Sequence, residues 1–362
     1  MLSQVCISII IPFYNAESYI ETCIDTLVKQ DFNKPFEIIM INDGSTDGGM
    51  DMIKAHSIPN IHLYSLAHNS GPGAARNLGL KMAKGKYIFF YDIDDTIDSN
   101  ILTTLYDTAI KKDYDLVFCD RRYIENSQNQ RNNMFSYPTD KYFENSDIVE
   151  EMRKRWYKPV YVSNIIDLSG RLIKRKIITD NKIYFEEKLR YMEDETFIWD
   201  VLGYVKNAVY IRNQLCSYFC YPNINTALSE GMNSVVNLLN FKLMKNHIQE
   251  SLKRQSISDI EAKKIGDQAF IFCIISALIS CSRSMLLGKL DWEKGNKIRK
   301  QLIKNIVSDI DVKKSIKNYT HSKNESFLIP KLIAWRFSFP LEILCTIRAK
   351  EILRIRRKND SL

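Results

Sequence analysis

Short apolar runs rich in β-branched and aromatic residues constrain the fold more than any other feature of this sequence. They occupy residues 5–13, 36–41, 61–66, 87–91 and 116–119. Continuous apolar runs of this length are typical of strands that are buried on both faces. Segments with helical spacing lie between several of them, at 17–28 after a possible N-cap at Asn15, at 74–83 and at 101–111. The alternation predicts an α/β fold with a mainly parallel sheet flanked by helices.

Two of these runs end abruptly in acidic loops. The run 36–41 is followed by Asn42-Asp43-Gly44-Ser45, and the run 87–91 by Asp92-Ile93-Asp94-Asp95. In parallel sheets ligands lie at the carboxyl ends of the strands. Asp92 and Asp94 can converge on one hard cation, and Mg²⁺ or Mn²⁺ accepts a few carboxylates together with phosphate oxygens. We therefore expect a metal–diphosphate site here, with Asp43 able to accept a hydrogen bond from a base N–H.

A third acidic pair, Glu193-Asp194, opens a predicted helix at 191–205. Each acidic cluster has an ordinary structural explanation when it is considered alone: a tight turn, a helix cap, or a charge that matches the helix dipole. The segment 71–77 places small residues and Arg76 where a ligand can approach closely. It matches neither a GxGxxG fingerprint nor a Walker loop, which argues against a dinucleotide oxidoreductase and a P-loop NTPase.

The length and charge distribution predict two domains. The chain has 362 residues, which exceeds the usual size of one compact domain. Residues 1–100 carry 7 basic and 12 acidic side chains, whereas residues 101–362 carry 44 basic and 31 acidic ones. Beyond about residue 229 the sequence is almost wholly helical and rich in lysine. We place the domains at 1–228 and 229–362.

The middle of the chain has a looser pattern. We expect helices at 146–156, 170–179 and 191–205, and short strands at 208–211 and 215–221. The 8 cysteines show no zinc-site spacing, which favours reduced core thiols in a cytoplasmic protein. The most apolar stretch, 269–281, is shorter than the about 20 residues that a spanning helix needs, so we expect it to be a core helix.

Five motifs in this order resemble the family 2 inverting glycosyltransferases with the GT-A fold, over roughly residues 5–222. They are SIIIPFYNAESYIETCIDTLVKQ, FEIIMINDGSTDGG, NSGPGAARNLGL, GKYIFFYDIDDTI and FEEKLRYMEDETFIWDVL. The resemblance implies a metal-dependent enzyme of bacterial surface-glycan synthesis. It would use Mn²⁺ or Mg²⁺ to move a sugar from a nucleotide-sugar, usually a UDP-sugar, to a glycan or lipid-linked acceptor.

The same resemblance assigns roles to individual residues. Pro12, Tyr14 and Asn15 would line the uridine pocket, Asp43 would hold the uracil, and Arg76 would lie beside the nucleotide. Asp94 would be the main metal ligand, with Asp92 near the ribose and the metal. Asp194 would be the general base, with Glu193 as the second choice. Asn164 and Arg171 match a region that often faces the acceptor or donor sugar.

One part of the pattern is missing. Many relatives carry an Arg or His after the last strand, near the diphosphate, but the segment SYFCYPNINTALS contains neither. Either another group contributes, with Arg171 or a C-terminal lysine as candidates, or the binding of the diphosphate there is weaker.

The C-terminal segment 328–357 combines aromatic, aliphatic and basic residues. This composition suits a helix at an anionic membrane surface, here the inner leaflet of the cytoplasmic membrane, and equally a helix packed on the catalytic domain. Homo-oligomer formation is also possible. No nucleic-acid-binding motif is present. The alternatives to the glycosyltransferase are a nucleotidyltransferase on a related fold and an inactive peripheral membrane scaffold.

Overall fold

The computed structural model describes residues 4–126, 129–131, 137–156, 164–189, 192–219, 237–321 and 326–359. The chain forms two compact units. The first contains Met1–Met152 and Val162–Pro222, and the second contains Arg153–Tyr161 and Asn223–Leu362. The predicted domain boundary at 228/229 lies outside the described residues.

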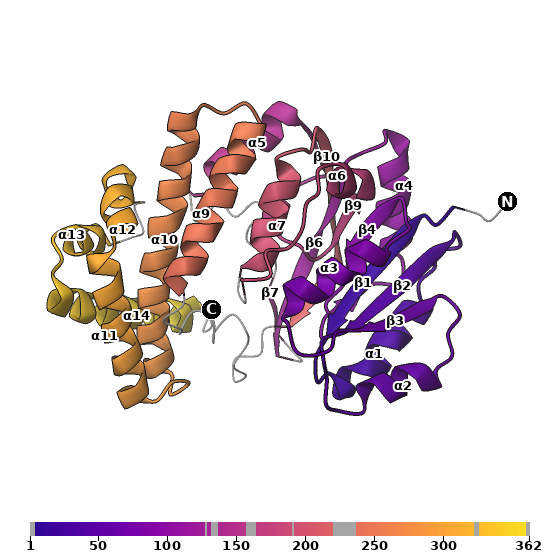
Figure 1. The fold of residues 1–362 in the computed structure, drawn as a ribbon, viewed down its shortest axis with the longest axis horizontal. Coiled ribbons are helices and arrows are strands. Elements are labelled where there is room, and N and C mark those ends of the chain that lie inside the picture. The colour runs from indigo at the N-terminus through magenta and orange to yellow at the C-terminus, as the bar shows by residue number, and fades with distance from the viewer. Residues whose placement is uncertain are drawn as a thin grey trace. The chain divides into compact units, whose positions relative to one another are not determined.

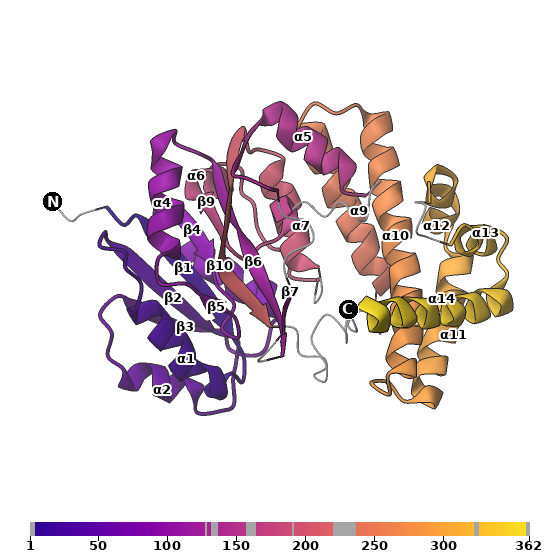
Figure 2. The same ribbon diagram turned by 180° about the vertical axis from the view of Figure 1, so that it is seen from behind.

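The first unit is built on a large mixed sheet (Figures 1 and 2). Its main path has the order β3-β2-β1-β4-β9-β6-β10-β5, with β7 on β6 and β8 on β10. The strands are β1 (Ile7–Phe13), β2 (Phe36–Asn42), β3 (Ile61–Ser65), β4 (Tyr87–Phe90), β5 (Thr96–Ile97), β6 (Leu116–Asn126), β7 (Asn129–Arg131), β8 (Lys141–Glu144), β9 (Arg171–Lys174) and β10 (Asn207–Phe219).

Parallel pairing dominates the half of the sheet that carries the candidate site. Strands β3, β2, β1 and β4 pair in parallel, and so do β6 and β10. The short elements β5, β7, β8 and β9 pair antiparallel to their neighbours. The predicted α/β class and the mainly parallel sheet are therefore confirmed.

Helices cover both faces of the sheet, as apolar residues on both faces of its strands require. One face packs against α1 (Glu17–Val28) and α4 (Ile101–Lys111), whose apolar stripes join the alternate strand residues in one core. On the opposite face, Ile10 of β1 lies against α3 (Pro72–Met82) and Phe90 of β4 against α7 (Glu193–Leu202). Three further helices complete the unit: α2 (Gly49–Ala55), α5 (Asn145–Lys154) and α6 (Arg175–Asp180).

Three local expectations were wrong. Residues 171–174 form strand β9 because they fill the space between β4 and β6, and the helix starts only at Arg175. Asn15 does not cap α1: its backbone has a φ of 47°, and Ala16 is the residue before the helix. The two strands predicted at 208–221 are one strand, β10, with irregular register between Ile211 and Cys216.

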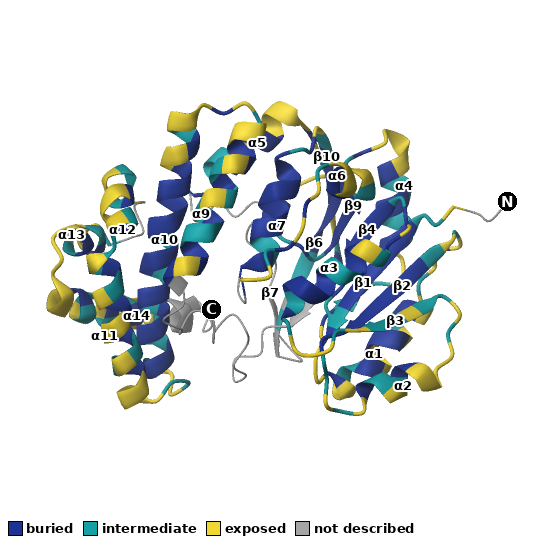
Figure 3. Ribbon diagram, viewed as in Figure 1, coloured by how far each residue is buried: buried dark blue, intermediate teal, exposed yellow. Residues whose placement is uncertain are grey.

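The second unit is helical, as the sequence predicts. Its helices are α9 (Asn237–Arg254), α10 (Asp259–Leu286), α11 (Trp292–Ser308), α12 (Ile310–Ser315), α13 (Leu328–Ala334) and α14 (Ser338–Asn359). A short 3₁₀ turn at Ile316–Asn318 follows α12, and the first unit has another at Asn164–Ile166. Figure 3 shows that α10 is largely buried among its neighbours.

Helix α10 is longer than the apolar stretch noted in the sequence. With 28 residues and a mean hydropathy of 1.9 in its most apolar window, it is long and apolar enough to cross a membrane. However, 72% of that window is buried inside the protein, as in the core helix of a soluble domain. Among the described residues it is the one helix that meets this test.

Candidate active site

The loops that follow β1 and β2 are tied together. The side-chain oxygen of Asn15 accepts a hydrogen bond from the backbone amide of Thr46 at 2.9 Å. The backbone amide of Asn15 donates to the hydroxyl of Ser45 at 3.0 Å. Pro12 pairs with Ile41 near the carboxyl end of β1, and Tyr14 is 46% exposed just beyond it. The predicted uridine-pocket residues therefore lie at the strand ends, with the Asn15 side chain engaged in holding the loop.

Asp43 is buried at the end of β2, where it fixes the start of α3. Its two carboxylate oxygens accept hydrogen bonds from the amides of Ser70 and Gly71, at 2.7 and 2.8 Å. Gly44 has a φ of 72°, and a Cβ there would lie 2.7 Å from the amide nitrogen of Asn69, so the turn needs glycine. Because a carboxylate oxygen has two lone pairs, Asp43 can still accept from a ligand.

Arg76 brings two of the acidic clusters together. This buried arginine of α3 donates to Asp92, in the loop after β4, at 2.8 Å and to Glu193, at the start of α7, at 2.9 Å. Its guanidinium also lies 5.4 Å from the ring centre of Phe185. The chain approaches closely here, since a Cβ on Gly73 would lie 3.3 Å from Phe185. The site therefore joins the carboxyl end of the sheet to α3 and α7.

The charges in this cluster shift one another's pKa values. Burial opposes the positive charge of Arg76, but Asp92, Glu193 and Asp194 outweigh it and raise its pKa. Burial, followed by the charge of Glu193, raises the pKa of Asp194 to about 7 although Arg76 opposes the shift. Glu193 is engaged with Arg76, whereas Asp194 accepts from the neighbouring amide of Glu195 at 2.7 Å. Of the two candidate bases, Glu193 pairs with Arg76. Among the described contacts, none joins Asp194 to Arg76 at hydrogen-bonding distance.

The loop after β4 carries three carboxylates that repel one another. Partial desolvation by the surrounding protein, followed by the charge of Asp92, raises the pKa of Asp94, which keeps solvent-accessible surface. Burial, Asp92 and Asp94 raise the pKa of Asp95 to about 8. Asp95 faces inward and accepts a hydrogen bond from Ser169 at 3.2 Å.

These residues fit a cation that is shared with a ligand. Among the described residues no group of three or more His, Cys, Asp or Glu side chains is arranged to hold a metal by itself. Two acidic side chains two residues apart, one of them solvent-accessible, fit Mg²⁺ or Mn²⁺ that takes its remaining ligands from phosphate and water. In this structure Asp92 is paired with Arg76 instead.

Arg171, one of the two residues predicted to face a sugar, lies in the core of the first unit. Arg171 is 1% exposed and donates to the backbone oxygens of Cys119 and Ser169, at 3.3 and 2.9 Å. Its surroundings are those of a core residue, which leaves its predicted contact with a sugar or diphosphate without support. Asn164 begins a 3₁₀ turn, and its side chain lies outside the described residues, as does the segment 220–222.

The sequence analysis did not single out Arg121 and Arg122, which lie in β6 beside β10. Arg122 donates to the hydroxyl of Ser217 at 2.9 Å and pairs with Asp98, while Arg121 pairs with Asp167 at 2.7 Å. They place positive charge beside β10, the strand after which the expected Arg or His is missing. Two adjacent arginines one residue beyond the apolar run 116–119 are the signal that could have identified them.

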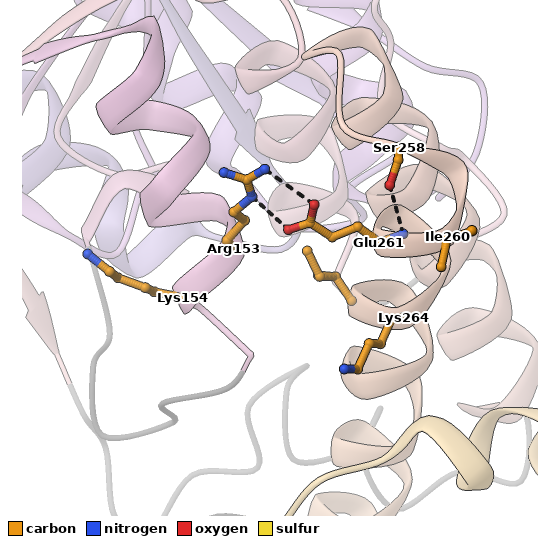
Figure 4. Close-up of a pocket in the computed structure, with 7 residues that line it drawn as sticks. Arg153, Lys154, Ser258, Ile260, Glu261 and Lys264 are labelled. Atoms are coloured by element: carbon orange, nitrogen blue, oxygen red, sulfur yellow. Dashed lines mark hydrogen bonds and ion pairs between the residues drawn. The ribbon is translucent and has the colours of Figure 1, made fainter.

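A separate pocket of about 600 Å³ lies in the second unit (Figure 4). Its lining comprises Arg153, Lys154, Ser258, Ile260, Glu261, Lys264 and Ile265. Arg153 pairs with Glu261 at 2.8 Å across it, and Ser258 accepts from the amide of Glu261 as the N-cap of α10. None of the predicted site residues lines this pocket.

Comparisons with known proteins find similar glycosyltransferases. Residues 8–178 match the sequence profile of Glycosyl transferase family 2. The chain is 31% identical over 199 residues to the uncharacterized glycosyltransferase EpsJ of Bacillus subtilis, covering 53% of this chain and 54% of that protein. It is 33% identical over 197 residues to a poly(ribitol-phosphate) beta-glucosyltransferase of Bacillus spizizenii, covering 53% of this chain and 28% of that one. The match thus spans about half or less of the length of these two relatives.

The fold is also that of a solved structure. The crystal structure of S. aureus TarS 1-349 in complex with UDP-GlcNAc superposes with a TM-score of 0.68 at 20% identity, covering 97% of this chain and 92% of that one. The profile match places a region similar to glycosyl transferase family 2 at residues 8–178, and the fold is that of the TarS structure.

Proposed function

We propose that the chain transfers a sugar from a UDP-sugar to a hydroxyl group of an anionic or lipid-linked bacterial surface glycan, with inversion at the anomeric carbon. The observation that carries this proposal is the convergence of Arg76, Asp92 and Glu193 beside Asp194, whose pKa is raised to about 7. It places a base that titrates near neutral pH next to a permanent cation and an acidic loop. Such a combination suits deprotonation of an alcohol beside a departing diphosphate.

In the proposed mechanism Asp194 is the general base. It takes the proton from the acceptor hydroxyl while that oxygen attacks the anomeric carbon. The bond from this carbon to the diphosphate oxygen breaks in the same step, and UDP leaves with the electron pair. A raised pKa makes Asp194 a better proton acceptor than an ordinary carboxylate, and it is still largely ionised above neutral pH.

The residues around Asp194 hold it and the donor in place. Glu193 and Arg76 form a buried ion pair that fixes the start of α7, so the base is presented from a rigid element. Asp43 would accept the ring N–H of the uracil through its remaining lone pairs, while Ser70 and Gly71 keep its orientation. Tyr14 is accessible for stacking on the base.

Asp92 and Asp94 would hold a divalent cation together with the diphosphate. Mn²⁺ or Mg²⁺ bound there would supply positive charge that stabilises the negative charge growing on the leaving UDP. A bound cation would share Asp92 with Arg76 and would offset the repulsion between the carboxylates of Asp92 and Asp94.

The names of similar proteins guide the choice of substrates to test. One relative is described as a poly(ribitol-phosphate) beta-glucosyltransferase, and the TarS crystal structure contains UDP-GlcNAc. We therefore propose UDP-glucose or UDP-N-acetylglucosamine as the donor and a poly(ribitol phosphate) or related anionic glycan as the acceptor class.

The test is a donor screen with the purified chain. UDP-Glc, UDP-Gal, UDP-GlcNAc and UDP-GalNAc are each incubated with poly(ribitol phosphate) or with a lipid-linked glycan, in Mn²⁺, Mg²⁺ or EDTA. We expect UDP release and sugar incorporation from one donor, lost in EDTA and restored by added Mn²⁺. The proposal fails if UDP and all four UDP-sugars show no binding by calorimetry at millimolar concentration. Turnover that is unchanged in EDTA would refute the metal part alone.

A further inference from the structure

The second unit exposes several large apolar side chains in the turn after α13 and on α14. Five of them define what we call the aromatic face: Trp335, Phe337, Phe339, Ile343 and Ile347, with exposed fractions of 58, 54, 73, 48 and 47%. Soluble proteins rarely expose a contiguous group of this kind, and such groups mark surfaces that bind another molecule. None of these residues takes part in the glycosyltransferase site described above.

Folding does not require these side chains to be apolar. Helix α14 buries a different stripe, Leu341, Cys345 and Ala349, each 0% exposed, on the side that packs against α10. Ile343 and Ile347 lie about 200° around the helix from Leu341 and Cys345, so they point away from this stripe. An ordinary surface helix has one apolar stripe, whereas the first half of α14 has two.

A buried arginine joins the helix that carries the aromatic face to two other helices. Arg299 of α11 is buried and donates to Thr346 of α14 at 2.8 Å, with Glu342 3.7 Å away. The same guanidinium donates to Ser282 of α10 at 3.0 Å, so one side chain joins three helices. Figure 2 shows α14 crossing α10 and α11. The exposed rings therefore project from a fixed surface and not from a loose tail.

The turn between α13 and α14 exposes two of the rings together. Arg336 adopts a left-handed conformation with a φ of 61°, and the amide of Phe337 donates to the carbonyl of Leu332 at 3.0 Å, which closes the end of α13. The rings of Trp335 and Phe337 flank this turn with centroids 6.2 Å apart. A non-glycine residue at positive φ costs stability, so this turn is held by its surroundings.

Positive charge accompanies the aromatic face. Lys331, Arg336, Lys350 and Arg354 are exposed on the same two helices or the turn between them. Residues 328–362 carry 8 basic and 3 acidic side chains in all. Trp and Phe beside Lys and Arg are the combination that binds at the headgroup level of anionic bilayers, where the rings enter the interface and the cations meet lipid phosphates.

We propose that the aromatic face docks the enzyme on the surface of a bilayer that contains anionic lipids. The charge argues against a second copy of the chain as the occupant, because two such faces would bring like charges together. Each exposed cation near the surface strengthens the attraction to anionic lipid, and added salt weakens it. Docking thus depends jointly on the rings and on the anionic lipid.

The experiment is cosedimentation of the full chain with phosphatidylcholine vesicles that either contain or lack about 30% phosphatidylglycerol. This anionic lipid gives the vesicle a negative surface potential. Trp335→Ser combined with Phe339→Ser is compared with Trp292→Ser, which removes a 50% exposed tryptophan from α11 of the same unit. We expect the wild type and Trp292→Ser to bind only the anionic vesicles. The double variant should bind them at least about tenfold more weakly.

The folded state and the self-association of each variant are followed in parallel. Circular dichroism and UDP binding should be unchanged in both variants, so a loss of vesicle binding reports the surface alone. Equal binding by the wild type and the double variant overturns the proposal. So does a wild-type dimer, seen by light scattering without lipid, that becomes a monomer in the double variant. The outcome is independent of which sugar the enzyme transfers.

Discussion

At the scale of single residues, Arg76 organises the candidate site. It pairs with carboxylates that lie 16 and 117 residues away in the sequence, which no local pattern links. The pairing distinguishes Glu193 from Asp194, because it occupies the first and leaves the second to titrate near neutral pH. Two adjacent acids in the same helical turn therefore have different surroundings, which suit the different roles that we propose for them.

Replacing Asp194 with Asn should abolish catalysis while preserving the donor site. The amide cannot accept the proton, so kcat should fall by about 10²–10⁴-fold with little change in UDP affinity. Glu193→Gln is the comparison: its amide oxygen can still accept from Arg76, so kcat should fall less than in Asp194→Asn although the buried ion pair is lost. The assignment is wrong if Glu193→Gln is the more damaging change or if Asp194→Asn keeps near wild-type turnover.

The activity should depend on pH through the same carboxyl group. A general base works when it is deprotonated, so kcat/KM should rise with pH and level off above the pKa of Asp194, about 7 in the free enzyme. Profiles measured in saturating Mn²⁺ separate this limb from metal binding. A limb with its midpoint near the ordinary carboxyl value of about 4 would contradict the raised pKa.

At the scale of elements, close packing at one glycine joins the start of β4 to β1. A Cβ on Gly85 would lie 2.4 Å from the amide nitrogen of Ser8 and 2.7 Å from the carbonyl carbon of Ile7. The amide of Gly85 also donates to the hydroxyl of Ser8 at 2.8 Å, and this hydroxyl donates to the buried Glu37 at 2.6 Å. The backbone of Ile7 and Ser8 cannot move away from Gly85 without disturbing the centre of the parallel sheet.

Gly85→Ala should therefore destabilise the first unit by about 1–3 kcal/mol, the usual cost of overpacking a core. Gly48→Ala is the control, since its Cβ meets only the side-chain carboxyl of Glu17, at 3.3 Å, and that flexible group can move. Midpoints of urea unfolding measured by near-ultraviolet circular dichroism would compare the two. Equal midpoints would show that the β1–β4 contact tolerates a side chain.

The element scale also shows where sequence periodicity succeeds. Strands β1, β2 and β4 and helix α4 are predictable to within about two residues because their burial pattern follows from their own side chains. Local preference predicts a helix at residues 171–174, because arginine, leucine and lysine favour helices. They form a strand because the sheet has a place for one between β4 and β6. Tertiary pairing overrides the local preference there.

At the scale of the whole molecule, the second unit has its own charged centre. Asp267 of α10 is 0% exposed and lies 2.6 Å from both Lys245 and Lys263. Ser315 and Asn318 each donate to it at 2.7 Å. Burial opposes its ionisation, but these hydrogen bonds outweigh burial and lower its pKa. Its stabilising effect is therefore present above the ordinary carboxyl pKa and is lost as the pH falls through the lowered value.

Asp267→Asn should destabilise the second unit selectively, by about 3 kcal/mol, because it leaves Lys245 without its buried partner. Hydrogen exchange should accelerate across α9, α10 and α12, with β1 and β2 unaffected. Asp259→Asn, at an 84% exposed carboxylate in the same helix, should leave exchange unchanged. Uniform acceleration in both units would mean that they unfold as one cooperative body.

The candidate site was predictable in its members but not in its contacts. Asp43, Arg76, Asp92, Asp94 and Asp194 all follow from motifs, since strand ends and small-residue loops leave a local signal. No local signal in the sequence indicates that Arg171 lies in the core or that Asn15 bonds to Thr46. Both contacts depend on which other segment folds against these residues. Arg121 and Arg122 likewise acquire partners only when β6 lies beside β10.

The sequence by itself determined the α/β class, the strand ends on which the acidic residues lie, and the helical, basic character of the second half. These properties are periodic or local, so each segment carries its own evidence for them. Only the tertiary structure decided which acid pairs with Arg76, which acid remains available as a base, and which apolar side chains of α14 stay exposed. Desolvation and charge pairing act through space, and their strength depends on neighbours that are distant in the sequence.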